Sequence, residues 1–306
     1  MDRQKVIAIV GPTASGKSAL AVELAKRFGG EIISADSRQV YLGLDIGTGK
    51  ITKRQMHGVP HHLLDVAPPK KRFPAHDFVV HASKEMHEIS ARGNVPIICG
   101  GTGFYIDALL GRIELSNVPA DERLRAKLDK KSAGQLFALL RKKDPKRAKN
   151  IDKRNKRRLI RALEISMSSI KSPPSSRPRL DIEKADCEVL WLGIAPKREE
   201  LRERINKRLA ARLKGGMIAE ARALHAAGLS YKRMEELGLE YRSLARFLRK
   251  KITREALESE LQAAIWHYAR RQLTYWRRNK EIRRLEPAKR SEAFKTAGRW
   301  LERDAV

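Results

Sequence analysis

Cysteine, acidic residues and long apolar runs are all scarce in this 306-residue sequence. Its only cysteines, Cys99 and Cys187, are too few for a disulfide framework and too far apart for a metal-binding motif, which fits a reducing compartment. No apolar stretch approaches the roughly 18 residues of a transmembrane helix, and the first apolar run, residues 6–10, is far shorter than a signal-peptide core. We therefore expect a soluble cytoplasmic protein that makes no use of a membrane.

The shortage of acidic residues leaves a large positive charge. The sequence has 36 Asp and Glu against 65 Lys and Arg, a formal net charge of +29. This excess is far beyond what solubility requires and indicates a polyanionic partner, with nucleic acid ahead of an anionic membrane surface. A general adaptation of solubility is the alternative. The length allows one large domain or two modest ones.

Short β-branched runs alternate with amphipathic helical segments over the first hundred residues. Strands are expected at residues 6–10, 31–34 and 95–101, and helices at about 17–28 and 77–92. This alternation is typical of a parallel sheet with crossover helices, so it predicts an α/β core.

The character of the chain changes from about residue 116. Strand signals disappear, and charged helical segments run to the Pro- and Ser-rich segment 172–178. An apolar β run at 188–196 then precedes several further helices. We expect a catalytic core formed by residues 1–115 and 186–306, interrupted by an inserted all-helical lobe, residues 116–185.

A glycine-rich loop, GPTASGKS, links the first expected strand to the first expected helix. It fits the phosphate-loop pattern G-x-x-x-x-G-K-[ST], in which backbone N–H groups and a helix N-terminus surround phosphate oxygens. Lys17 supplies a charge for the terminal phosphate, and the Ser18 hydroxyl can hold Mg²⁺. The predicted phosphate- and substrate-binding residues are Gly11, Pro12, Thr13, Ala14, Ser15, Gly16, Lys17 and Ser18, with Ser18 as the metal ligand.

The acidic residue that usually accompanies this loop is missing. NTPases with a phosphate loop normally add a strand that ends in Asp near the metal. Here the strand at 95–101 leads into Thr102, and the run at 188–196 ends without an acid. Asp65, in HHLLD, is the only other contender. We therefore expect the loop to hold a diphosphate rather than to support hydrolysis of a triphosphate.

Polar residues follow two of the expected strands. If the diphosphate is a leaving group, the site needs a proton acceptor for the attacking group and hydrogen-bond donors for the departing charge. Asp36, in ISADSRQVY, and Thr102, in CGGTGFY, both belong at the carboxyl edge of the sheet, beside the phosphate loop. A helix cap or a metal ligand remains an alternative role for Asp36, and a turn hydroxyl remains one for Thr102.

The segment after the insertion predicts an amphipathic helix with cations on its flank. Leu201, Ile205 and Leu209 form an apolar stripe at i, i+4 and i+8. Arg204 and Arg208 lie one turn apart beside it, where they can clamp a diphosphate or simply face water.

Six motifs occur in one order along the chain: GPTASGKS, ISADSRQVY, DIGTGK (45–50), CGGTGFY, the helix with RINKR, and YARRQLTYWRR (268–278). This set resembles the tRNA dimethylallyltransferase family over nearly the whole chain. That family is similar in architecture to P-loop kinases but transfers dimethylallyl from its diphosphate to N6 of adenosine 37 of tRNA, releasing pyrophosphate. The resemblance implies Mg²⁺ as cofactor, the tRNA anticodon stem-loop and dimethylallyl diphosphate as partners, and a monomer.

The resemblance also implies roles for matching residues. Asp36 takes the proton from the adenine amine, whereas Thr102, Lys17 and Arg208 face the leaving diphosphate. Asp36, Thr102 and Arg208 are accordingly the expected catalytic residues. The residues implied at the tRNA are Asp36, Ser37, Arg38, Gln39, Thr102, Arg125, Arg157, Arg158, Leu159, Ile160 and Arg161.

Two segments depart from the family pattern. Its usual Gly-Tyr-Arg-Glu reads Gly238-Leu239-Glu240-Tyr241-Arg242 here, which leaves the role of that segment open. The segment 141–158 holds eleven Lys and Arg in eighteen positions, more than the family leads us to expect. Such charges add contacts to an RNA backbone without reading its sequence.

Three other functions remain open from the sequence. The first is an isopentenyltransferase acting on free adenine nucleotide, which would not need the basic insertion. The second is a nucleotide-dependent kinase, which the missing acid disfavours. The third is a non-catalytic RNA-binding protein that uses nucleotide as a switch, which the position of Asp36 disfavours.

Overall fold

The computed structural model describes residues 3–116, 118–168, 187–287 and 289–304. The chain divides into two compact units, residues 1–113 with 184–306, and residues 114–183. We call the first unit the core and the second the lobe. The predicted Pro- and Ser-rich segment 172–178 lies outside the described residues.

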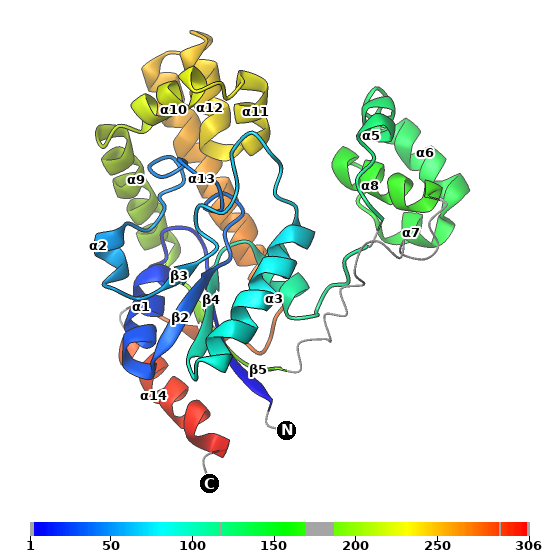
Figure 1. Ribbon diagram of the computed structural model, residues 1–306. Helices are drawn as coiled ribbons and strands as arrows, with labels where there is room; N and C mark the ends of the chain where they lie inside the picture. The colour runs from blue at the N-terminus through cyan, green and yellow to red at the C-terminus, as the bar shows by residue number, and fades with distance from the viewer. Residues whose placement is uncertain (1–2, 117, 169–186, 288, 305–306) are drawn as a thin grey trace. The chain divides into compact units, whose positions relative to one another are not determined.

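A parallel sheet forms the centre of the core (Figure 1). Its strands are β1 (Gln4–Val10), β2 (Gly30–Ser34), β3 (His61–His62), β4 (Val95–Gly100), β5 (Cys187–Ile194) and β6 (Arg283–Leu285). Within the described part of the chain, the strand order is β3-β2-β4-β1-β5-β6, and neighbouring strands pair in parallel. The predicted α/β fold with a parallel sheet is confirmed.

Helices cover this sheet and explain its apolar strands. Residues 6–10 of β1 are all buried, as expected for a central parallel strand that is covered on both faces. Ile7 and Ile9 pack in one apolar cluster with residues of α1 (Lys17–Phe28) and α14 (Arg290–Leu301). The helix α3 (Ala75–Ala91) contacts β2 and β4, and α4 (Gly103–Leu109) packs on α3.

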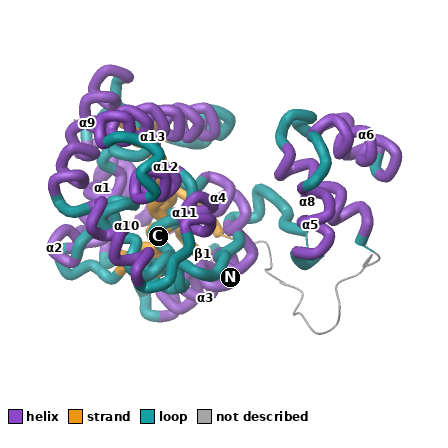
Figure 2. Tube along the Cα trace, turned by 90° about the horizontal axis from the view of Figure 1, so that it is seen from above, coloured by secondary structure: helices purple, strands orange, loops and turns teal. Residues whose placement is uncertain are grey.

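A helical bundle lies beyond the carboxyl ends of the strands, where α9 and α13 run side by side (Figures 1 and 2). Its helices are α9 (Arg198–Lys214), α10 (Met217–Ala226), α11 (Tyr231–Leu237), α12 (Leu239–Leu248) and α13 (Arg254–Trp276). Val40, Tyr41 and Leu44 are buried against this bundle. The long loop after β2 is therefore held between the sheet and the helices, with the short α2 (Lys53–Met56) following it.

The lobe is helical throughout its described residues. It comprises α5 (Glu122–Asp129), α6 (Ala133–Lys143), α7 (Pro145–Asn150) and α8 (Lys156–Met167). A side-chain cap begins each helix: Asp121, Ser132, Asp144 and Asn155 each accept a backbone N–H three residues on. A small leucine-rich cluster forms its interior.

A short 3-10 helix, η1 (Glu302–Asp304), follows α14. Among the described residues, no helix has both the length and the apolar character that crossing a bilayer demands.

Candidate active site

The phosphate loop turns the chain from β1 into α1, as the motif predicts. Gly16 has a φ of 97°, which favours glycine, and a Cβ on Gly11 would lie 2.7 Å from the Ile194 carbonyl oxygen. No described side chain caps α1, so its first N–H groups remain available for oxyanions. Lys17 Nζ donates a hydrogen bond to the Pro12 carbonyl of the loop at 3.3 Å.

A cavity beside this loop brings predicted residues together from distant segments. The predicted site residues that line it are Thr13, Lys17, Ser18, Asp36, Gln39 and Arg208. Ala21, Ile32, Ile51 and Cys99 line it as well. A cavity with both cationic and apolar lining suits a diphosphate that carries a hydrocarbon group.

Asp36 holds a turn with one carboxylate oxygen. Its Oδ1 accepts the backbone N–H of Arg38 at 2.9 Å and that of Gln39 at 3.4 Å. No residue that the structure describes donates a hydrogen bond to Oδ2, and Asp36 lines the cavity. The capping role and the predicted base are therefore compatible in one side chain, because each uses a different oxygen.

Thr102 supports the turn that carries Asp36. Its Oγ1 accepts the Ser37 N–H at 3.1 Å, and its own N–H donates to the Ala35 carbonyl at 3.2 Å. Thr102 is not among the residues that line the cavity. Its contact with the diphosphate stays a prediction.

Of the two cations that line the cavity, Lys17 is half-buried, whereas Arg208 is exposed over much of its side chain. Burial lowers the pKa of Lys17 and of Arg208 below their ordinary values, and Asp36 opposes this shift in both. The Arg208 guanidinium donates to the Gly49 carbonyl at 2.5 Å. Two positive charges that have lost part of their hydration favour an incoming diphosphate, which stabilises both.

Arg204 contacts the phosphate loop but is also paired. It donates to the Ser15 carbonyl at 3.3 Å and forms an ion pair with Glu200 at 2.6 Å. Of the two predicted clamp arginines, Arg208 is thus the one that lines this cavity.

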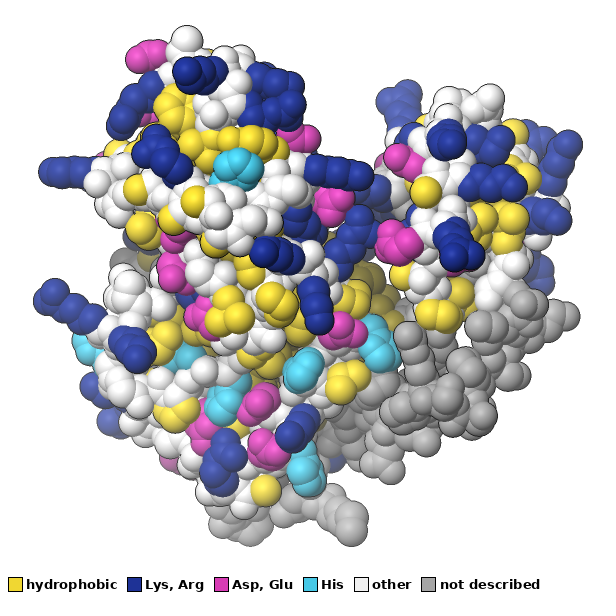
Figure 3. All heavy atoms as spheres, turned by 45° about the horizontal axis from the view of Figure 1, so that its top comes forward, with side chains coloured by type: hydrophobic (Ala, Val, Ile, Leu, Met, Phe, Trp, Pro, Cys, Tyr) yellow, Lys and Arg dark blue, Asp and Glu magenta, His cyan; other side chains and the backbone are white. Residues whose placement is uncertain are grey.

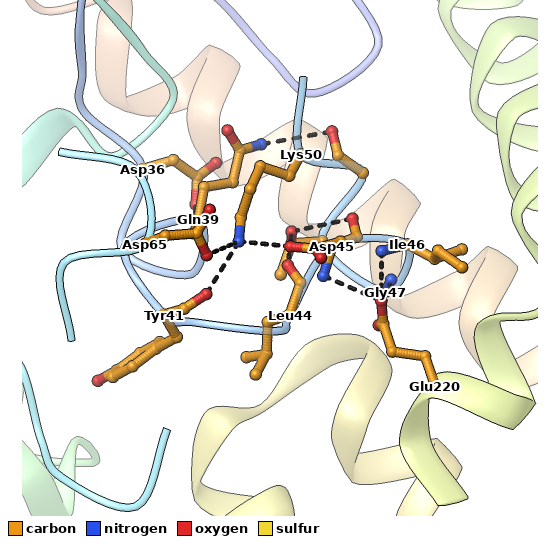
Figure 4. Close-up of polar contacts among 12 residues, drawn as sticks. Asp36, Gln39, Tyr41, Leu44, Asp45, Ile46, Gly47, Lys50, Asp65 and Glu220 are labelled. Carbon is orange, nitrogen blue, oxygen red and sulfur yellow. Dashed lines mark hydrogen bonds and ion pairs between the residues drawn. The ribbon is translucent and has the colours of Figure 1, made fainter. Parts of the chain in front are cut away.

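A carboxylate on α10 organises the DIGTGK loop (Figure 4). Glu220 accepts the backbone N–H groups of Asp45 at 3.0 Å, Ile46 at 2.6 Å and Gly47 at 2.9 Å. The Tyr241 hydroxyl donates to the same carboxylate at 2.6 Å. This loop carries the Gly49 carbonyl that Arg208 contacts, so Glu220 helps to fix the position of the Arg208 side chain.

A buried lysine closes the other side of the same loop (Figure 4). Lys50 Nζ donates to the Tyr41 carbonyl at 2.9 Å and pairs with Asp45 at 2.6 Å and Asp65 at 2.5 Å. Asp65, the only other contender for an acid at the metal, is therefore engaged with Lys50 and does not line the cavity.

The segment that departs from the family pattern supports the DIGTGK loop too. Glu240 pairs with Arg212 at 3.0 Å, and Arg212 donates to the Gly47 carbonyl at 2.7 Å. Tyr241 is the donor to Glu220 described above. The role that the sequence left open therefore includes holding residues 45–50.

Ser18 is suited to hold a divalent cation beside substrate phosphates. It lines the cavity, as does Cys99. Across the described ranges, no group of three or more His, Cys, Asp or Glu side chains could hold a metal. This donor set fits Mg²⁺, which keeps several waters and binds largely through substrate phosphates.

The lobe residues predicted at the tRNA fall into three groups. Arg157 and Arg158 are exposed, without an ion pair to any described residue. Arg125 and Arg161 both pair with the buried Glu164, which the former approaches to 2.9 Å. The remaining two lie in the interior of the lobe: Leu159 is 0% exposed and Ile160 8%.

The contact of Leu159 and Ile160 with tRNA stays a prediction, and their side chains are buried within the lobe. Both belong to the apolar cluster of the lobe, since they lie on the face of α8 that packs inward. The charged part of this segment that faces outward is Arg157 and Arg158.

Comparison with known proteins identifies the family. Residues 39–279 match the model of the IPP transferase family. The chain belongs to this family. It is 43% identical to tRNA dimethylallyltransferase 2 of Treponema denticola over 278 residues, which cover 90% of this chain and 93% of that relative. It is 37% identical to tRNA dimethylallyltransferase of Pediococcus pentosaceus, with 97% of each chain covered.

Solved structures agree with this assignment. The tRNA isopentenylpyrophosphate transferase of Bacillus halodurans superposes with a TM-score of 0.73 at 36% identity, covering 98% of this chain and 97% of that one. A eukaryotic dimethylallyltransferase acting on tRNA gives a TM-score of 0.77 at 23% identity, which shows likeness of fold alone. The family predicted from the motifs and its P-loop kinase-like architecture are confirmed.

Two supporting residues escaped the sequence analysis. Glu220 lies in α10, outside every motif, and its partners are backbone N–H groups that carry no sequence signature. Gln272 lies inside YARRQLTYWRR, but the resemblance implied no role for it. Its burial, at 4% exposure, is the signal that marks it in the structure.

Proposed function

We propose that this protein transfers a dimethylallyl group from dimethylallyl diphosphate to N6 of adenosine 37 of tRNA, next to the anticodon, and releases diphosphate. One observation carries the proposal: a single cavity is lined by two cations and by one carboxylate, and one oxygen of that carboxylate is free of described partners. Membership of the IPP transferase family supports the same conclusion.

The cations serve the leaving group. As the bond between C1 of the allyl group and the diphosphate oxygen breaks, its electron pair leaves with the diphosphate. Lys17, Arg208 and the N–H groups at the start of α1 stabilise that charge where it develops. Ser18 would hold Mg²⁺, which supplies further charge stabilisation when bound.

The carboxylate serves the nucleophile. The exocyclic amine of adenine is a poor nucleophile because its lone pair is delocalised into the ring. Asp36 Oδ2 accepts the N6 proton as the N6–C1 bond forms, while Oδ1 stays bonded to the backbone of the turn. The base leaves the anticodon stack to reach this cavity.

The lobe serves the RNA. Exposed cations such as Lys153, Arg154, Arg157 and Arg158 favour contacts to phosphates, which fix the position of a nucleic acid without reading its sequence. Figure 3 shows Lys and Arg side chains across the visible face of the lobe. A small-molecule acceptor would not require this surface.

One assay separates the candidate functions. The protein is incubated with Mg²⁺, radiolabelled dimethylallyl diphosphate, unmodified tRNA and an equal concentration of AMP. We expect the label in the tRNA without any requirement for ATP. Label in AMP would favour the free-nucleotide transferase, and label in neither would contradict the proposal.

A further inference from the structure

One face of α13 packs against the edge of the sheet where the site lies. Tyr268, Gln272 and Tyr275 are spaced i, i+4 and i+7 on this helix, so they share a face. Tyr268 and Tyr275 lie at the two ends of this face, and the Tyr275 hydroxyl donates a hydrogen bond to Asp107. Gln272 lies between these two and is the buried polar residue of the three.

The Gln272 amide joins two strand ends. Its Nε2 donates to the Gly101 carbonyl at 3.0 Å, and its Oε1 accepts the Thr13 N–H at 2.8 Å. Gly101 directly precedes Thr102, and Thr13 lies in the phosphate loop. One side chain therefore bridges the loop expected to hold the donor and the turn that supports Asp36.

The glycines of CGGTGFY make room for this arrangement. A Cβ on Gly101 would lie 2.0 Å from Gln272 Nε2, and a Cβ on Gly103 would lie 2.2 Å from the Tyr275 ring. Both distances are shorter than any side chain tolerates without displacing its neighbour. Glycine at these positions is thus required by the close approach of α13.

The bridge stands where the sheet itself ends. The paired register of β1 and β4 ends at Val10 opposite Gly100, so no ladder hydrogen bond between these two strands fixes the residues beyond. The amide group of Gln272, with one donor and one acceptor, resembles a peptide unit inserted between the two segments. It extends the cross-link past the last ladder pair.

We propose that Gln272 is a positioning residue that fixes the phosphate loop relative to the Thr102 turn, and hence the donor carbon relative to the adenine amine. This inference rests on the proposed function. A shift of about 1 Å between reacting groups can lower a rate about 100-fold even when both substrates still bind.

Gln272→Met tests the proposal, because it keeps the length of the side chain and removes both hydrogen bonds. We expect the single-turnover rate at saturating donor and tRNA to fall about 10- to 100-fold, with Kd for tRNA unchanged. Gln262→Met, at an exposed position on the same helix, is the matched control and should keep the full rate. An unchanged rate for folded Gln272→Met would overturn the positioning role.

A second pair of variants separates positioning from general damage to the fold. Gly101→Ala forces Gln272 away and should lower the rate to a similar extent. In Gly101→Ala combined with Gln272→Ala the clash is absent, so the double variant should be no slower than Gln272→Ala alone. Multiplicative losses would contradict the bridge. If the wild-type protein transfers no label, the proposed function fails, and this inference fails with it.

Discussion

The cations of the core cavity and those of the lobe are held in different ways. In the cavity, Lys17 is half-buried and Arg208 is exposed, and each donates a hydrogen bond to a backbone carbonyl group of a loop. In the lobe, Arg157 and Arg158 are exposed and make no ion pair within the described ranges. Charges held in place by hydrogen bonds can stabilise a negative charge that develops at one position, whereas charges without such bonds attract the many phosphates of a polyanion.

A second contrast concerns two carboxylates, Glu220, which is half-buried in the core, and Glu164, which is buried in the lobe. Glu220 in the core organises a loop of the site through three backbone N–H groups. Glu164 in the lobe is 2% exposed and ties down Arg125 and Arg161. Hydrogen bonds from these arginines hold the pKa of Glu164 below its ordinary value although burial alone would raise it. Glu220 thus holds a loop of the site, whereas Glu164 stabilises the lobe, whose surface carries exposed cations.

The largest expected effect follows from Asp36→Asn in the core. Asn keeps an Oδ1 that can accept the N–H groups of Arg38 and Gln39, but it replaces the free Oδ2 by a donor. The single-turnover rate should fall by roughly 10² to 10⁴, while diphosphate affinity and melting temperature barely change. A near-normal rate would contradict the role as base and indicate that Asp36 only caps the turn. Weaker Mg²⁺-dependent diphosphate binding would instead indicate that Asp36 is a metal ligand.

Lys17→Ala should act on the donor as well as on the rate. Removal of this charge takes away an interaction made with the bound diphosphate and with the leaving group. We expect the rate to fall by roughly 10² to 10³ and the Kd for dimethylallyl diphosphate to rise. Measuring donor binding by calorimetry beside the rate distinguishes this pattern from that of Asp36→Asn. Unchanged donor affinity would place the diphosphate elsewhere.

A quadruple variant of the lobe should have a lower affinity for tRNA but an unchanged rate at saturating tRNA. It replaces Lys153, Arg154, Arg157 and Arg158 by Gln. Each lost phosphate contact should reduce the slope of log K against log salt by about 0.7 to 0.9. The structure favours this set because Lys156, also in this segment, pairs with Asp129 at 3.2 Å.

The matched control for the lobe removes equal charge from the core. Lys26, Arg27, Lys295 and Arg299 are exposed on α1 and α14. Their replacement by Gln should leave the salt slope unchanged. Equal slopes for both quadruple variants would mean that the lobe attracts tRNA only through net charge.

The smallest expected effect comes from Glu220→Ala. Loss of the acceptor leaves three N–H groups of the DIGTGK loop without their partner, at a cost of about 1 to 3 kcal/mol in unfolding free energy. Because the loop supports Arg208, donor affinity should fall roughly 10-fold, equivalent to about 1.4 kcal/mol. Chemical denaturation and donor titration check the two effects. A stability loss without any loss of donor affinity would show that the loop does not place Arg208.

The sequence predicted the elements whose signals are local. The buried run 6–10, the loop with Lys17 and the helix after it follow from periodicity and glycine spacing, and the structure confirms them. Asp36 and Arg208 were brought to one cavity by the rule that sites lie at the carboxyl ends of parallel strands.

The supporting residues that could not be predicted from the sequence act through contacts between distant residues. Gln272 and Glu220 bond to the backbone of segments far away in the chain, and any residue type presents the same N–H and carbonyl groups. The burial of Leu159 and Ile160 had a local signal, because Leu163 follows the first by four residues and the second by three, which is the spacing of one helix face.

Transfer to a tRNA that lacks the attacking amine tests the central claim most directly. Two otherwise identical unmodified tRNAs are compared, one with adenosine at position 37 and one with purine riboside there. Label transfer from dimethylallyl diphosphate is followed by nuclease digestion and mass spectrometry. The account predicts modification at N6 of adenosine 37 in the first tRNA and none in the second, with equal binding of both. Label in the second tRNA, or at another nucleotide of the first, would contradict it.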